Sequence, residues 1–274
     1  MSTTTPSRAP AKLTVQAIRQ RKGAAKLVAL TAYDVMFARL ADAAGVDIVL
    51  VGDSLGMMVQ GHANTLPVTL EDVVYHTRAV ARGVAHAHLV ADMPFMSYQA
   101  SLEDGIRAAG RLLQQGGAES VKIEGGAEVA ELVHRLTTYG IPVMAHVGMT
   151  PQSVHQYGGF KVQGREEQSH KRILDGALAV VDAGAYAVVV ESVPEALGQE
   201  LTQRLHVPTI GIGAGANCDG QILVMHDVLG LDPHWKPRFA RQYAALGQQA
   251  QAAFAAYADD VRHGRFPSND ETFK

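Results

Sequence analysis

The sequence predicts a (β/α)8 barrel, a closed ring of eight parallel strands with helices packed around it. Short apolar runs recur eight times along the chain. Each run is continuous rather than alternating, as expected for strands that are buried on both faces. Segments with helical spacing of apolar residues lie between most of the runs, and this alternation is typical of parallel α/β folds. A doubly wound open sheet is the main alternative on strand and helix counts alone.

The eight expected strands share an apolar centre and a polar or glycine-rich end, where turns are expected. In chain order they are "LVAL" (27–30), "DIVLV" (47–51), "HLVA" (88–91), "SVKI" (120–123), "PVMA" (142–145), "AVVV" (187–190), "PTIGI" (208–212) and "QILVM" (221–225).

Helices are expected between these strands. Thr69 is a suitable N-cap for the second of them, because Glu71 and Asp72 follow in the first turn, and Ser101 is a suitable N-cap for the third. The expected helices are "DVMFARLADAAG" (34–45), "TLEDVVYHTRAVARGV" (69–84), "SLEDGIRAAGRLLQQGG" (101–117), "AEVAELVHRLTTYG" (127–140), "HKRILDGALAVVDAGA" (170–185) and "VPEALGQELTQRL" (193–205).

The remaining segments are assigned around one catalytic domain, residues 13–267. A polar tail, 1–12, precedes it and a short tail, 268–274, follows it. A short helix within 12–23 is expected to close the bottom of the barrel, and a long helical region is expected over 234–264. The connection from Gly148 to Gln168 is far longer than a usual βα loop, which makes it a candidate lid.

Composition narrows the possible functions. The 274 residues are 47% hydrophobic with a net charge of −3, which gives no reason to expect nucleic acid or an anionic membrane as a partner. The single cysteine, Cys218, excludes an internal disulfide framework and a multi-cysteine metal site. No segment has the apolar length of a membrane span or a signal peptide, so we expect a cytoplasmic protein.

Polar side chains end five consecutive strands, and a parallel barrel builds its active site at these carboxyl ends. Taken alone, each has a structural explanation. A strand-end Asp often caps a helix, His146 could be a core histidine, and Glu191 could cap the helix near Pro194. As an ensemble they indicate a site, and the candidates are Asp53, Ser54, Asp92, Lys122, Glu124, His146 and Glu191. His226 and Asp227, after the eighth strand, are interpreted as structural.

The three carboxylates of this set predict a cation. Lys122 and Glu124 are two residues apart and therefore share one face of their strand. If that face points inward, Glu124 meets Asp53 and Asp92, and such carboxylates repel one another unless a cation offsets them. Oxygen-only ligands from separate strands favour Mg²⁺ over Zn²⁺. Lys122 adds a fixed positive charge for an anionic substrate, although it could also form a structural ion pair with Glu124.

This set of groups suits proton removal beside a carbonyl. A divalent ion that binds a 2-oxo acid polarises its C=O bond, and a base such as Glu191 can then take the proton from the adjacent carbon. His146 can donate a hydrogen bond to a substrate oxygen. The residues alone do not identify the electrophile that the resulting enolate attacks.

Long blocks of this sequence resemble the 3-methyl-2-oxobutanoate hydroxymethyltransferase (ketopantoate hydroxymethyltransferase) family. The similarity is collinear from about Leu13 to Pro267, and the departures from the family pattern are the amino-terminal extension and Asn217-Cys218. The blocks that carry it are "VGDSLGMMVQGHANTLPVTLEDVVYHTRAV", "ADMPFMSY", "VKIEGG", "HVGMTPQSVHQYGGFKVQGR", "VVVESVP" and "IGIGAGANCDGQILVMHDVLG".

The resemblance implies a (β/α)8 barrel with one Mg²⁺ per subunit, which transfers a one-carbon unit from 5,10-methylenetetrahydrofolate to 3-methyl-2-oxobutanoate in the first step of pantothenate biosynthesis. It also implies a homo-oligomer, usually a decamer. Carried over by position, the metal-linked carboxylates are Asp53, Asp92 and Glu124. The substrate contacts are Asp53, Ser54, Asp92, Lys122 and His146, and the catalytic proton acceptor is Glu191. The resemblance assigns no pterin-binding residues.

Two alternatives stay open at this point. The first is a Mg²⁺-dependent 2-oxo acid lyase or mutase of the phosphoenolpyruvate/pyruvate type, which would need no one-carbon donor. The second is an inactive barrel that senses a keto acid or serves as a scaffold. The complete set of site residues argues against the second.

Overall fold

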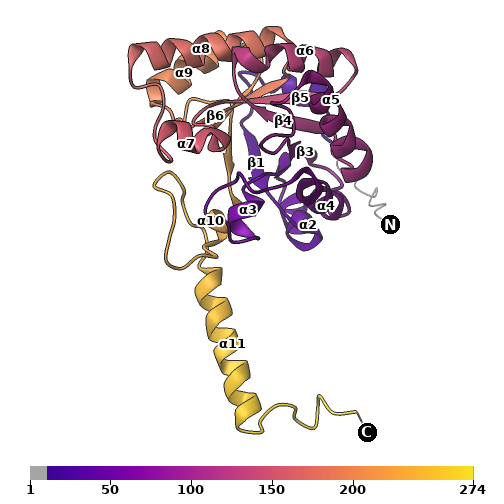
Figure 1. The fold of residues 1–274 in the computed structure, drawn as a ribbon. Coiled ribbons are helices and arrows are strands. Elements are labelled where there is room, and N and C mark those ends of the chain that lie inside the picture. The colour runs from indigo at the N-terminus through magenta and orange to yellow at the C-terminus, as the bar shows by residue number, and fades with distance from the viewer. Residues whose placement is uncertain (1–10, 274) are drawn as a thin grey trace, which may run out of the picture. The chain divides into compact units, whose positions relative to one another are not determined.

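The computed structural model describes residues 11–273, so residues 1–10 of the expected amino-terminal tail lie outside it. The chain divides after Leu223 into two compact units. The first unit contains a closed barrel in which all eight strands are parallel and follow one another in chain order. Figure 1 shows these strands with the helices of the first unit outside them. The predicted (β/α)8 fold is therefore confirmed.

All eight expected strands are present, with ends within three residues of the predicted ones. They are β1 Leu27–Thr31, β2 Ile48–Val51, β3 His88–Asp92, β4 Ser120–Glu124, β5 Val143–Gly148, β6 Ala187–Glu191, β7 Thr209–Ile212 and β8 Gly220–Leu223. The strands β2 to β5 and β7 are buried along their whole length. This explains why they read as unbroken apolar runs rather than as alternating ones.

Seven helices of the first unit occupy the expected positions, whereas the four-residue helices α3 Leu55–Met58 and α7 Val154–Tyr157 were not predicted. The seven are α1 Val15–Arg19, α2 Val35–Ala43, α4 Leu70–Ala81, α5 Leu102–Arg111, α6 Ala130–Thr138, α8 Glu167–Asp182 and α9 Glu195–Arg204. A π-helical turn, 112–116, extends α5, and 3₁₀ turns over 127–129 and 151–153 precede α6 and α7.

The two predicted N-caps are confirmed. Thr69 accepts a hydrogen bond from the Asp72 backbone N–H at 3.2 Å, and the Asp72 carboxylate accepts one from the Thr69 backbone N–H at 2.9 Å. This reciprocal capping box satisfies two N–H groups that a helix start leaves without partners. Ser101 caps α5 in the simpler way, by accepting from the backbone N–H of Asp104.

The barrel interior is filled by apolar side chains from most of the strands. Ile18 of α1 is fully buried in this cluster. This agrees with the expected role of the amino-terminal helix, since its neighbours include Leu27 at the start of β1. The other members are Ala29, Ile48, Leu50, Val90, Met144, Tyr186, Ala187, Val189, Ile210, Ile212 and Ile222.

The second unit differs from the sequence prediction. Only α11, Leu246–Arg262, is a long helix, and residues 234–245 are turns and extended segments rather than part of it. Pro237 accounts for the part of this segment up to residue 236, because proline disfavours helical backbone at the preceding residue and lacks a donor N–H. A short helix, α10 Met225–Leu229, was not predicted, and its first residue, Met225, was assigned to the eighth strand. None of the helices in the described part of the chain is long and apolar enough to cross a membrane.

Asp219 directly precedes β8 and connects segments at the amino-terminal ends of the barrel strands. One carboxylate oxygen accepts hydrogen bonds from the Thr209 backbone N–H at 2.9 Å and from Lys22 Nζ at 2.8 Å, and the other accepts from the Gly23 backbone N–H at 3.0 Å. Burial raises the pKa of Asp219, but Lys22 and the backbone donors outweigh burial and leave the pKa below its usual value. Asp219 therefore ties β7 and β8 to the segment after α1.

We expect Asp219→Asn to destabilise the protein by about 2–4 kcal/mol at neutral pH, because the amide replaces a buried, multiply hydrogen-bonded charge. A carboxylate whose pKa is lower in the folded state than in the unfolded state stabilises the fold when the pH is above the unfolded-state pKa. This stability is lost as the pH falls through the folded-state pKa. Urea unfolding at pH 7 and pH 3.5 should therefore show a smaller difference from wild type at the lower pH. The exposed Asp175→Asn variant is the control. Equal stability of Asp219→Asn and wild type at pH 7 would contradict this role.

Candidate active site

The strand register brings the predicted site residues together at the carboxyl ends of the barrel strands. Asp92 of β3 lies opposite Lys122 of β4, and Glu124 lies opposite His146 of β5. Gly148 of β5 in turn lies opposite Glu191 of β6. Because parallel strands present their ends at one edge, side chains far apart in sequence become neighbours.

Ion pairs and hydrogen bonds connect these residues into one cluster. The Asp53 backbone N–H donates to Asp92 Oδ2 at 2.9 Å, and Asp92 Oδ1 lies 2.7 Å from Lys122 Nζ. Lys122 Nζ lies 3.2 Å from His146 Nδ1. His146 Nδ1 lies 3.4 Å from Glu124 Oε1, and its Nε2 lies 3.1 Å from Glu191 Oε2.

Ser54 belongs to the same end of the barrel. Its hydroxyl lies 2.8 Å from the hydroxyl of Tyr33, which follows β1. A Cβ atom on Gly52, two residues before Ser54, would lie 2.7 Å from Ser54 Oγ and 3.3 Å from Asp92 Oδ2. The glycine that directly follows β2 thus leaves room for the hydroxyl and the carboxylate.

The cluster combines high burial with high charge density. The exposed fractions of Asp53, Asp92, Lys122 and Glu124 are between 3% and 6%. Burial lowers the pKa of Lys122, but the attraction of Asp92, Glu124 and Asp53 outweighs it, so the net shift is upward. Lys122 is therefore a permanent cation among buried carboxylates.

The pKa values of the three carboxylates do not all shift in the same direction. Burial, and then the charges of its neighbours Asp92 and Glu124, raise the pKa of Asp53 well above its usual value. Burial also raises the pKa of Asp92, against the opposing effect of Lys122. Burial acts in the same direction on Glu124, but His146 and Lys122 outweigh it and lower its pKa. The ends of β2 and β3 are thus where additional positive charge would be most stabilising.

His146 is positioned as a cation between two carboxylates. Burial and Lys122 lower its pKa, whereas Glu124 and Glu191 raise it, and the net pKa is about 9. The imidazolium form satisfies both carboxylates, and Lys122 Nζ is then a like-charged neighbour whose repulsion they offset. Of the acids in the cluster, Glu191 is the most accessible, with a side-chain exposure of 17%. It is therefore the carboxylate best placed to meet a substrate from solvent.

Two functional residues were missed by the sequence reasoning, Gln152 and Tyr98. Gln152 Nε2 donates to Asp53 Oδ2 at 3.0 Å, and its backbone N–H donates to Glu124 Oε2 at 3.0 Å. The Tyr98 hydroxyl lies 2.9 Å from Gln152 Oε1. Gln152 therefore bridges two of the predicted carboxylates. The sequence feature that could have indicated Gln152 is the short polar segment "TPQS" (150–153), shortly after β5 and within the predicted candidate lid.

Gly148 sets the position of Glu191. Its φ is +99°, and a Cβ atom there would lie 2.3 Å from the carbonyl oxygen of Glu191. We expect Gly148→Ala to displace the end of β6 and to reduce turnover at least about tenfold, since small misplacements of catalytic groups are costly. Gly140→Ala is a matched control, because its φ is +83° and a Cβ atom would contact nothing within 4 Å. Steady-state turnover and thermal unfolding of both variants test this, and equal turnover in the two would contradict it.

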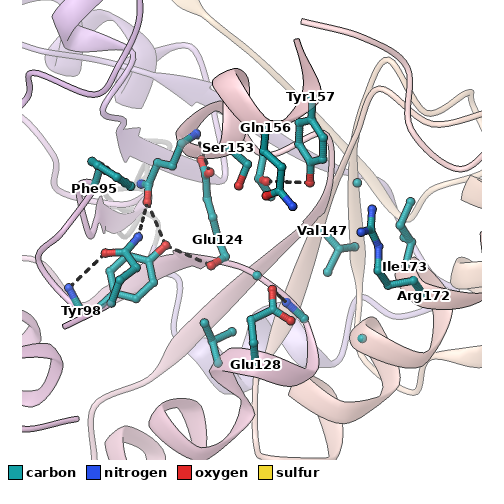
Figure 2. A pocket seen from close by; sticks show the side chains of 18 residues that line it. Phe95, Tyr98, Glu124, Glu128, Val147, Ser153, Gln156, Tyr157, Arg172 and Ile173 are labelled. Atoms are coloured by element: carbon teal, nitrogen blue, oxygen red, sulfur yellow. Dashed lines mark hydrogen bonds between the residues drawn. The ribbon is translucent and has the colours of Figure 1, made fainter. Parts of the chain in front are cut away.

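A cavity of about 470 Å³, which we call the inner cavity, opens beside Glu124. Figure 2 shows Glu124 in it, with Phe95 and Tyr98 on one side of the view and Arg172 and Ile173 on the other. Among the predicted site residues, only Glu124 lines this cavity, together with Gln152 from the bridge described above. The inner cavity therefore adjoins the charged cluster without containing it.

The carboxylates meet some requirements of a hard divalent ion. Asp92 Oδ1 and Glu124 Oε1 are buried and accept no well-aligned hydrogen bond within the described residues, although Lys122 and His146 lie near them. No three His, Cys, Asp or Glu side chains in the described part of the chain surround one point as ligands. Mg²⁺ is commonly held by one or two carboxylates, with water and substrate completing its shell. Asp53 and Asp92 are the candidate carboxylates for such an ion, because their raised pKa values mark the places where added positive charge would be most stabilising.

Solved structures with the same fold include two enzymes of low sequence identity to this chain. A phosphonopyruvate hydrolase superimposes with a TM-score of 0.61 at 15% identity, covering 95% of this chain and 91% of its own. A 2,3-dimethylmalate lyase superimposes with a TM-score of 0.59 at 18% identity, covering 94% and 91%. At this level of identity the similarity concerns the fold alone.

Sequence relatives are much closer. A 3-methyl-2-oxobutanoate hydroxymethyltransferase of Syntrophus aciditrophicus is 51% identical over 263 residues, which cover 96% of this chain and 97% of the relative. An enzyme of the same name from Thermus thermophilus is 53% identical over 260 residues, or 95% and 99% of the two chains. The family model for ketopantoate hydroxymethyltransferase matches residues 12–269. With the cluster of acids, lysine and histidine at its barrel mouth, this chain belongs to the ketopantoate hydroxymethyltransferase family of enzymes.

Proposed function

We propose that this enzyme transfers a hydroxymethyl group from 5,10-methylenetetrahydrofolate to 3-methyl-2-oxobutanoate and forms 2-dehydropantoate, the first step of pantothenate biosynthesis. The observation that carries the proposal is the buried cluster in which Lys122 and His146 lie between Asp92, Glu124 and Glu191. The cluster combines fixed cations for an anionic 2-oxo acid with one accessible carboxylate. The names of the relatives with about 50% identity support the same activity.

Asp53 and Asp92 are the residues proposed to hold Mg²⁺, with Glu124 as the third carboxylate near it. When bound, the ion would polarise the carbonyl of the keto acid and so make the C3–H bond more acidic. Lys122 and Ser54 hold the substrate oxygens, and His146 lies against them as a positive charge while its two ring nitrogens face Glu124 and Glu191.

Glu191 acts as the base in this proposal. Its carboxylate removes the C3 proton, and the electron pair of the C–H bond becomes that of an enolate. Opening of the five-membered ring of the donor breaks the bond between the methylene carbon and one folate nitrogen, and the enolate carbon bonds to that methylene carbon. Water then replaces the second folate nitrogen and becomes the hydroxyl group of the product, and the two nitrogens take up the proton from C3 and one proton from water. His146, 3.1 Å from Glu191 Oε2, orients the carboxylate. Burial of the cluster excludes bulk water, which strengthens these electrostatic interactions.

The competing function is a Mg²⁺-dependent lyase or mutase that acts on a 2-oxo acid of the phosphoenolpyruvate/pyruvate type. The solved structures named above share the fold with this chain, and fold alone does not favour their chemistry. The sequence relatives give the hydroxymethyltransferase proposal the stronger support. A cytoplasmic location and a homo-oligomer, a decamer by family resemblance, are further proposals.

A donor-dependence assay separates the two functions. Purified enzyme is incubated with 3-methyl-2-oxobutanoate, with and without 5,10-methylenetetrahydrofolate, and 2-dehydropantoate is measured by mass spectrometry. We expect product only with the donor, loss of product with EDTA, and recovery when Mg²⁺ is added. Consumption of the keto acid without any one-carbon donor would favour the lyase reaction.

A further inference from the structure

A second cavity lies beside the inner cavity and is rich in basic residues. Its volume is about 490 Å³, and we call it the basic cavity. Lys161, Arg165 and Arg172 contribute three cations to its lining, against the one carboxylate of Glu166. Its lining therefore carries an excess of two positive charges and favours an anionic ligand.

The cations of the basic cavity have no carboxylate partners. Lys161, Arg165 and Arg172 form none of the ion pairs found among the described residues, whereas neighbouring basic groups do. Lys171, next to Arg172 on α8, pairs with Asp175, and His170 pairs with Glu200. The unpaired charges are thus concentrated on the part of α8 and the preceding loop that faces the cavity.

Arg172 lines both cavities, so the two cavities adjoin at this side chain. The lining of the inner cavity includes the aromatic and apolar side chains of Phe95, Tyr98, Tyr157 and Ile173 beside polar ones such as Glu128, and it reaches Glu124 of the reactive cluster. Figure 2 shows Arg172 on the side of the inner cavity opposite Phe95 and Tyr98. From the cluster outward, a ligand would therefore meet first the carboxylate of Glu124, then the aromatic side chains and then the basic side chains.

We propose that the basic cavity binds the glutamate carboxylates of the one-carbon donor, and that the inner cavity takes its pteridine and aminobenzoate rings. This inference rests on the proposed function. A reduced folate has a fused heterocycle at one end, a benzene ring in the middle and one or more glutamates at the other. The transferred carbon is attached near the heterocycle, so the rings must approach the cluster while the carboxylates stay outside. The two cavities present matching chemistry in that order.

Arg172 has the central role in this arrangement. It lies where the aromatic part of the ligand ends and its first carboxylate begins, and guanidinium groups pair with carboxylates in a two-pronged geometry. Lys161 and Arg165 contact further carboxylates, so a donor with several glutamates binds more tightly than one with a single glutamate. Tail length then affects affinity, whereas the transferred carbon is the same in every form.

Equilibrium titration of three non-reacting probes tests the proposal without turnover. The probes are tetrahydropteroate, which lacks glutamate, tetrahydrofolate with one glutamate, and tetrahydrofolate with three. We expect affinity to increase in that order for the wild-type enzyme, and to weaken as NaCl is raised. Arg172→Gln should weaken binding of both glutamate-bearing probes, and Lys161→Gln and Arg165→Gln mainly that of the triglutamate. Each loss should be about two- to fivefold, with binding of tetrahydropteroate unchanged.

Lys171→Gln is the matched control, since it removes an adjacent charge that points to Asp175. Equal affinity of the wild-type enzyme for all three probes would overturn the proposal, and so would a loss in Lys171→Gln as large as that in Arg172→Gln. Donor-dependent product formation is measured in parallel. Product that forms with the same donor KM for every tail length overturns only the tail site, whereas absence of product with any donor overturns the proposed function.

Discussion

Glu191→Gln should lower turnover by about 10²–10⁴-fold while the enzyme still binds the keto acid, since this is the usual contribution of a positioned general base. The amide keeps the size of the side chain at the end of β6 and removes its capacity to accept a proton. The neighbouring His146, 3.1 Å away, remains able to hydrogen-bond to it. Steady-state kinetics and a titration with 3-methyl-2-oxobutanoate measure the two effects separately.

Glu200→Gln is a suitable control, because Glu200 lies on α9 and pairs with His170 rather than with the cluster. Its turnover should match that of wild type. If Glu191→Gln kept more than a tenth of wild-type turnover, another group would have to remove the proton. If it lost substrate affinity instead of turnover, Glu191 would be a binding residue.

Lys122→Met should destabilise the fold by about 3–5 kcal/mol at neutral pH, because removing one partner of a buried ion pair leaves the other charge uncompensated. Asp92 Oδ1 lies 2.7 Å from Lys122 Nζ and would lose that partner. Asp53 and Glu124 would lose the attraction of the same cation. Urea unfolding at several pH values measures the loss, and activity should be abolished.

The pH dependence gives this prediction a second readout. Burial already raises the pKa of Asp92 above its unfolded-state value, and loss of Lys122 would raise it further. The folded variant then binds more protons than the unfolded chain between these two pKa values, so stability falls as pH rises through that interval. The deficit relative to wild type should be smaller at pH 5 than at pH 8.

Two variants check the cause of this instability. Adding Asp92→Asn to Lys122→Met should restore part of the lost stability, because it removes the uncompensated charge. The exposed Lys171→Met variant should change stability by less than about 0.5 kcal/mol. A pH-independent loss that Asp92→Asn does not relieve would mean that Lys122 matters for its packing alone.

The barrel and the strand-end residues were predictable from sequence because their signals are local. A strand buried on both faces must be apolar along its length, so a polar residue at its end stands out, as Asp53 does after β2. Strand periodicity placed Lys122 and Glu124 on one face. The register that sets Glu124 opposite His146 follows from the closed parallel topology.

Other features depend on contacts between distant segments and have no local signal. Gln152 is a polar residue in a long loop, and its role follows only from its bonds to Asp53 and Glu124. The two cavities bring together side chains from the segments after β3, β4 and β5 and from α8. The start of the long helical region was misjudged because apolar spacing was given more weight than Pro237.

Isotope exchange at C3 of 3-methyl-2-oxobutanoate tests the central claim, that the strand-end cluster makes this C–H bond acidic. The wild-type enzyme is incubated in D2O with the keto acid and Mg²⁺, without folate, and exchange is followed by proton NMR. We predict enzyme-dependent loss of the C3 proton signal, abolished in Glu191→Gln. No exchange above the rate in buffer, or equal exchange in Glu191→Gln, would contradict the account.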